Sequence, residues 1–80
     1  MSNIREVLEN KGSSVVSVSI DTSVLEAIGT MSEANIGAVV VMHEGKAVGI
    51  FTERDYLRKI ALKGRSSDDT VMSEVMSSPL

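Results

Sequence analysis

The residues of this 80-residue sequence that best combine type and spacing for chemistry are Thr52 and Asp55, three positions apart. A carboxylate accepts hydrogen bonds at both oxygens, so Asp55 suits the two neighbouring hydroxyls of a ribose. Both residues lie where a helix is expected to begin, and the free N–H groups of a helix N-terminus favour a phosphate. The same pair is also an ordinary helix cap, worth about 1 kcal/mol without any ligand. Taken alone, the two residues favour the cap.

The charged residues are distributed unevenly along the chain. Eight Lys and Arg against eleven Asp and Glu give a net charge of −3, which disfavours binding to nucleic acid or to anionic membranes. Five of the eight basic residues nevertheless lie between Glu53 and Arg65. Arg54 and Arg58, four positions apart on the expected helix, are candidates to attract one phosphate. Arg58 also fits a solvated helix face, together with its basic neighbours.

Several other kinds of chemistry are disfavoured by the composition. The chain has no cysteine and a single histidine, His43, which is expected in a turn. These residues cannot supply a nucleophile with its base or a metal cluster, so we predict no enzyme, no metal and no cofactor. No apolar run approaches the roughly 20 residues that a membrane span needs, so no membrane insertion is expected. The lack of cysteine fits a reducing compartment, and we expect a cytoplasmic protein.

Residue patterns predict three strands, over residues 16–20, 38–42 and 47–51. The first alternates valine or isoleucine with serine, which is typical of a strand with one buried face. The second is an unbroken apolar run, so we expect it to be covered on both faces. A turn containing Gly45 joins the last two strands as a hairpin, because glycine readily adopts positive φ.

Two helices are predicted between and after these strands. Ser23 followed by Glu26 is typical of a capping box, and the first helix is expected to end near Asn35. The second begins at Thr52 and ends near Gly64. Its apolar positions are expected to face the sheet: Leu57, Ile60 and Ala61.

The two ends of the sequence resemble each other. Asn3 and Glu6 predict a short N-terminal helix, and residues 72–76 echo residues 4–8 at an offset of 68 (72 − 4). We therefore predict an N-terminal helix and linker over 1–12, one repeat over 13–66 and the start of a second repeat over 67–80. The predicted class is α+β, with a short preceding helix, a three-stranded sheet and two packed helices.

Three segments in this order, 21–27, 35–41 and 49–55, resemble the cystathionine-β-synthase (CBS) domain family over nearly the whole chain. The resemblance implies a β-α-β-β-α unit that pairs with a second unit through its sheet to form a Bateman module. Clefts of such modules hold AMP, ADP, ATP or S-adenosylmethionine. The family implies no catalysis but regulation of an associated enzyme, channel or transporter.

The resemblance also implies roles for particular residues. It places the ribose on Asp55, with the Thr52 hydroxyl at the ribose or phosphate, and so favours ligand contact over capping alone. It places adenine between Val16 and the segment Ile36-Gly37-Ala38. Gly37 and Ala38 stand where some members carry basic residues, so a weaker grip on di- and triphosphates is expected. The predicted ligand-binding residues are Val16, Ile36, Gly37, Ala38, Thr52, Arg54, Asp55 and Arg58.

The principal alternative is a structural dimerisation module whose ligand site is empty. A chain of this size buries only about 60% of the surface that it exposes when unfolded. We therefore expect a homodimer through the sheet and helix faces.

Overall fold

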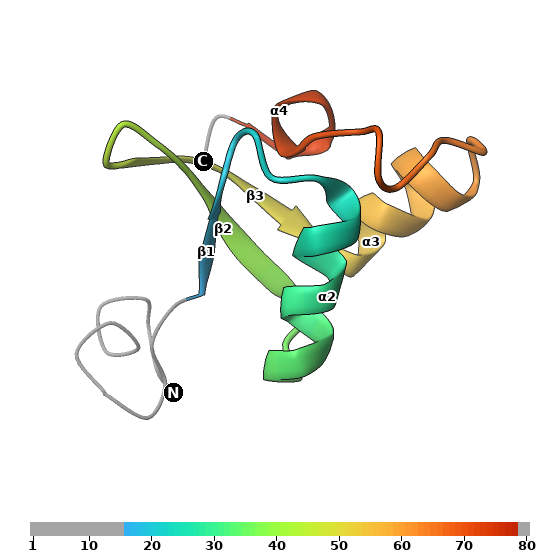
Figure 1. The fold of residues 1–80 in the computed structure, drawn as a ribbon, viewed down its shortest axis with the longest axis horizontal. Coiled ribbons are helices and arrows are strands. Elements are labelled where there is room, and N and C mark those ends of the chain that lie inside the picture. Colours follow the sequence, from blue (N-terminus) through green and yellow to red (C-terminus); the bar gives the residue numbers. More distant parts are fainter. Residues whose placement is uncertain (1–15, 79–80) are drawn as a thin grey trace.

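The computed structural model describes residues 16–78 as a three-stranded mixed sheet with helices packed against it (Figure 1). Strand β1 (Ser17–Ser19) runs parallel to β2 (Ala38–His43), and β2 pairs antiparallel with β3 (Lys46–Thr52). The strand order is therefore β1-β2-β3. This arrangement confirms the predicted α+β class, whereas the predicted N-terminal helix lies outside the described residues.

Helix α2 (Val24–Ala34) connects the two parallel strands. The Ser23 hydroxyl accepts a hydrogen bond from the Glu26 N–H at 3.1 Å, which confirms the predicted cap. The helix ends at Asn35, which adopts a left-handed conformation with φ of 56°. Its buried residues are Val24, Ala27 and Met31.

The β2–β3 hairpin presents one closed and one partly open face. Val39 and Val41 are buried, whereas Val40 and Met42 are only half-buried. Within the described part of the chain, one face of β2 is fully covered and the other only in part, so full coverage of both faces stays a prediction. Gly45 has a φ of 80° in the turn, as its position predicted.

Beyond β3 the chain forms α3 (Glu53–Tyr56), which continues directly into the π-helical segment η2 (Leu57–Ala61). Gly64 follows with a φ of 67°, consistent with the predicted helix end. The helical segment lies at the end of β3 (Figure 1).

The π-helical turn changes which side chains of this segment are buried. The Leu62 N–H donates to the Leu57 carbonyl at 2.9 Å, five residues back, so the turn is wider than an α-helical one. Ile60 is buried, but Leu57 is 53% exposed and Ala61 is exposed too. The prediction that Leu57 and Ala61 face the sheet is wrong, because it assumed a period of 3.6 residues.

The C-terminal segment packs into the same core. Helix α4 (Met72–Val75) buries Met72 and Val75 almost completely, at 0% and 1% exposed. Ser77 forms an antiparallel bridge with Ile50, on β3. The structure therefore uses this segment to complete the first unit, and the predicted start of a second repeat over 67–80 stays a prediction.

A single apolar cluster joins the sheet, α2, η2 and α4. Its buried members are Val24, Ala27, Met31, Val39, Val41, Phe51, Ile60, Met72 and Val75. Phe51 is the largest of them and is fully buried. This cluster fixes the end of β3 and hence the start of α3, where the predicted site lies.

Candidate functional site

Four predicted site residues meet at one end of the sheet. The Val40 N–H donates to the Val16 carbonyl at 3.1 Å, which ties the start of β1 to β2. Ala38 pairs with Thr52 across the antiparallel ladder. The Glu53 N–H donates to the Gly37 carbonyl at 3.0 Å. The strand register therefore brings Val16, Gly37, Ala38 and Thr52 to the same region, whereas their predicted contacts with a ligand stay a prediction.

A cavity of about 400 Å³ opens beside this region. That volume lies within the range of small-molecule sites, about 300–1,000 Å³. The residues that line it come from α2, its C-cap, the start of β2 and the start of α3: Ile28, Met31, Ser32, Asn35, Ile36, Gly37 and Glu53. Ile36 and Gly37 are the two predicted site residues in this lining.

Glu53 is the one charged residue in that lining, within the part of the chain that the structure describes. Its Oε1 would lie 3.4 Å from a Cβ built on Gly37, so the carboxylate extends over this glycine. Glu53 was not predicted as a site residue. The sequence signal that could have indicated Glu53 is its position next to Thr52 and close to Asp55, the predicted ligand-binding pair.

Thr52 and Asp55 form a complete capping box at the start of α3. The Thr52 N–H and hydroxyl donate to Asp55 Oδ2 at 3.0 and 3.2 Å, and the Asp55 N–H donates to Thr52 Oγ1 at 3.1 Å. Asp55 is 8% exposed. The capping interpretation of this pair is therefore confirmed, whereas the structure does not test ligand contact.

Two residues that the sequence did not predict hold the Asp55 carboxylate as well. The Ser77 hydroxyl donates to Oδ1 and Oδ2 at 3.1 and 3.4 Å. Lys59 Nζ lies 3.1 Å from Oδ1 and donates to the Val75 carbonyl at 2.8 Å. The four-residue spacing from Asp55 to Lys59 was a usable signal, because such pairs meet on one helix face.

The balance of burial and contacts sets the charge state of Asp55. Burial raises the pKa of the carboxyl, since desolvation disfavours the charged form. Several contacts lower the pKa, and together they outweigh this effect of burial. They are the hydrogen bond from Lys59, the hydrogen bond from the Thr52 N–H, the charge of Lys59 and the hydrogen bond from the Ser77 hydroxyl. They hold the pKa of Asp55 below its usual range, so the group is ionised at neutral pH.

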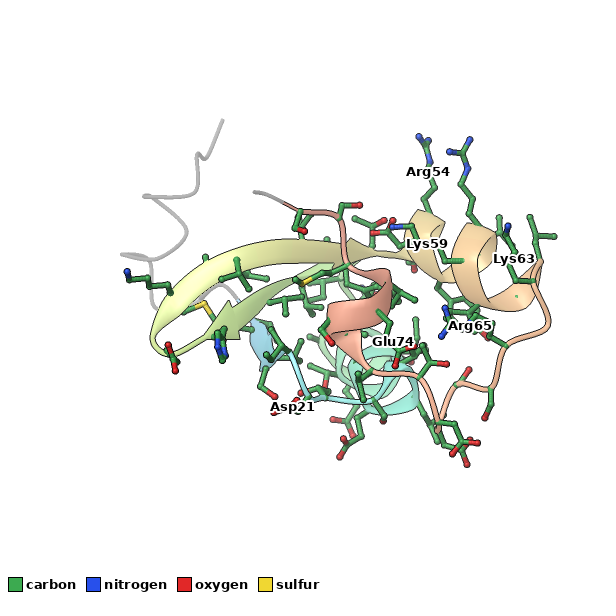
Figure 2. All side chains as sticks on the ribbon, turned by 90° about the horizontal axis from the view of Figure 1, so that it is seen from above. Asp21, Arg54, Lys59, Lys63, Arg65 and Glu74 are labelled. Atoms are coloured by element: carbon green, nitrogen blue, oxygen red, sulfur yellow. The ribbon has the colours of Figure 1, made fainter. Side chains whose placement is uncertain are left out.

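The two predicted arginines lie outside the cavity lining. Arg54 and Arg58 are both exposed, and Arg54 points away from the body of the protein (Figure 2). Thr52, Glu53 and Asp55 already have partners in the chain for their N–H groups. Few free N–H groups are therefore left at the start of α3 for the phosphate contacts that were predicted there.

Two structural features are absent from residues 16–78. This part of the chain contains no group of three or more His, Cys, Asp and Glu side chains placed to hold a metal ion. It also contains no helix of the length and hydropathy that a membrane span requires.

Comparison with known proteins identifies a family model and several relatives that match this chain. The model of the CBS domain family matches residues 4–62. A mitochondrial CBS domain-containing protein of Arabidopsis thaliana, CBSX3, is 40% identical over 92% of this chain, which spans 39% of that protein. The CBS domain-containing protein YhcV of Bacillus subtilis is 32% identical over the whole chain, which spans 54% of it. The chain thus spans about half or less of the length of these relatives.

Solved structures agree with this assignment. A CBS-domain containing protein from Agrobacterium tumefaciens is 41% identical, with a TM-score of 0.76 over 92% of this chain and 60% of that one. A protein with CBS domains from Burkholderia ambifaria is 36% identical, with a TM-score of 0.80 over 92% of this chain and 56% of that one. From its family match, its relatives and its fold, we conclude that this chain belongs to the CBS domain family.

Proposed function

We propose that this CBS domain is a regulatory module that binds an adenosine-containing ligand, AMP, ADP, ATP or S-adenosylmethionine, where it pairs with a second repeat. Ligand binding changes the activity of an associated enzyme or transporter according to the concentration of the ligand. The module itself carries out no reaction. The cytosol is the compartment in which we expect it to work, although the relative in Arabidopsis is mitochondrial.

The observation that carries the proposal is the Asp55 carboxylate, ionised and almost buried beside Thr52. Such a group forms charge-assisted hydrogen bonds with vicinal hydroxyls, each worth about 1.5–3 kcal/mol when water is excluded. Thr52 also pairs with Ala38 across the β2–β3 ladder, and this pairing connects the Asp55 carboxylate to the end of the sheet where Val16, Gly37 and Ala38 lie. We therefore propose that the ribose contacts Asp55 and Thr52.

The base is proposed to lie against the backbone at the sheet end. Val16 and the segment 36–38 border this region, and adenine needs an apolar slot with one N–H and one carbonyl at its edge. The Glu53 carboxylate lies close by, and Arg54 is directed outward. These charges support a preference for ligands with one phosphate or none over di- and triphosphates.

Calorimetry on the 80-residue chain tests the proposal, with AMP, ATP and S-adenosylmethionine as probes. Asp55→Asn should weaken binding at least tenfold, because one charge-assisted hydrogen bond is worth about that factor. Ser23→Ala removes a comparable helix cap away from the site and should leave binding unchanged. No heat for any probe at millimolar concentration, with the chain shown to be paired by sedimentation, would reject ligand binding and leave a structural dimerisation module.

A further inference from the structure

The Asp55 carboxylate has no free acceptor position for a ligand in this conformation. A carboxylate offers about four acceptor positions. Donors already reach it from the Thr52 N–H, the Thr52 hydroxyl, the Ser77 hydroxyl and Lys59 Nζ. If a ribose is to contact this carboxylate, at least one of these donors has to leave.

These donors differ in how easily each can leave. Both Thr52 groups belong to the capping box at the start of α3, so their removal would undo the helix start. Lys59 is held by the Val75 carbonyl as well as by Asp55, and Figure 2 shows it on the helical segment that follows β3. Ser77 is exposed and lies 22 positions away in the sequence. Its hydroxyl is therefore the donor that can be exchanged at least cost.

The Ser77 hydroxyl is also chemically equivalent to a sugar hydroxyl. It is shared between both Asp55 oxygens, at 3.1 and 3.4 Å, so its departure frees an acceptor position on each oxygen for the two vicinal hydroxyls of a ribose. We infer that Ser77 occupies the ribose position on Asp55, so that the ligand and the segment 76–78 compete for the same carboxylate. This inference rests on the proposed function and adds a mode of regulation to it.

The competition would connect the site to the rest of the protein. Ser77 is fastened to the edge of β3 by two backbone hydrogen bonds with Ile50, at 3.0 and 2.8 Å. Next to it, Met76 Sδ would lie only 2.7 Å from a Cβ on Gly49, so the segment fits closely against the strand. A ligand that takes the place of the Ser77 side chain pushes residues 76–78 aside and thereby loosens their attachment to β3.

The test compares AMP binding to the 80-residue chain and to its Ser77→Ala variant by calorimetry. The variant keeps the backbone bridge but lacks the competing hydroxyl, so AMP should bind about tenfold more tightly. Ser78→Ala, at the next and equally exposed position, is the matched control and should bind like wild type. In an Asp55→Asn background, Ser77→Ala should lose its effect, because the shared acceptor charge is gone.

A second readout separates competition from a merely structural role of Ser77. Saturating AMP should speed hydrogen exchange at the amides of Ile50 and Ser77, each of which donates to the carbonyl of the other residue across the bridge. Equal AMP affinity of wild type and Ser77→Ala, with unchanged exchange, would overturn the competition and leave the proposed function intact. Failure of AMP to bind either protein would overturn both.

Discussion

At the scale of single residues, the proposed ligand binding depends on the environment of Asp55. The carboxylate is almost buried, and Lys59 supplies a compensating positive charge one helical turn away. A buried charge without such a partner would be strongly destabilising. The pairing keeps the group ionised and therefore able to bind hydroxyls.

The pH dependence of stability tests this environment. Because the folded pKa of Asp55 lies below that of the unfolded chain, about 3.9, its stabilising contribution is complete well above that pH. The contribution is lost as the pH falls through the unfolded value toward the folded one. The difference in unfolding free energy between wild type and Asp55→Asn, from urea titrations, should therefore be largest above about pH 5 and shrink below about pH 4.

Glu33→Gln, which changes an exposed carboxyl on α2, is the matched control for that series and should differ little from wild type. Protein concentration is kept constant because association also affects stability. If the Asp55→Asn difference were the same from pH 3 to pH 7, the described charge state would be wrong.

The partners of Asp55 show what local sequence can and cannot predict. Taken without the family resemblance, Thr52 and Asp55 predicted a cap, because a capping box is encoded by residues three positions apart. The contact of Asp55 with Lys59 could in principle have been predicted, because residues four positions apart meet on one helix face. Ser77 was out of reach, since its contact spans 22 positions and depends on the path of the C-terminal segment.

At the scale of elements, the central feature is the contact between β3 and the segment after α4. Gly49 is buried on β3, where it packs against Met76 and Ser77. A Cβ at this position would lie 2.7 Å from Met76 Sδ and 2.9 Å from the Ser77 carbonyl. The absence of a side chain at Gly49 is therefore what permits the bridge.

Gly49→Ala should destabilise the protein by about 1–3 kcal/mol, because an added methyl group overpacks a close contact. Gly29→Ala is the matched control, since Gly29 lies in α2 with no atom within 4 Å of a Cβ there. It should stabilise the protein by about 0.5–1 kcal/mol. Urea unfolding measures both, and a stabilised Gly49→Ala variant would contradict the described packing.

The elements were largely predictable because their signals are local. Alternating valines, capping residues and turn glycines lie within a few positions of the structures that they determine. The side-chain orientation along η2 was not predictable, because nothing in residues 57–61 distinguishes a π-helical from an α-helical turn before packing places Ile60 in the core. The same holds for α4, whose burial against the first unit depends on long-range contacts.

At the scale of the whole molecule, the described residues leave one sheet face partly open. Val40 and Ile50 are opposite each other in the ladder, and both are only half-buried. A chain of this size has little core to spare, so a second copy on this face would supply missing apolar burial.

We propose that two copies associate through this face, and sedimentation of two variants tests it. Val40→Lys places a charge on the open face and should shift the chain to a monomer. Leu62→Lys changes a leucine that is 73% exposed on the helical side and should leave the dimer intact. If Leu62→Lys instead separated the copies, the helix face would be the interface.

The claim that an adenosine-containing ligand is held at Asp55 is tested most directly by nuclear magnetic resonance of the labelled chain during titration with AMP. The capping-box amides of Thr52 and Asp55 report on the carboxylate itself, and those of Gly37 and Ala38 report on the sheet end. We predict that the largest shifts occur at these four amides. Unchanged spectra at millimolar AMP, or shifts confined to other parts of the chain, would contradict the account.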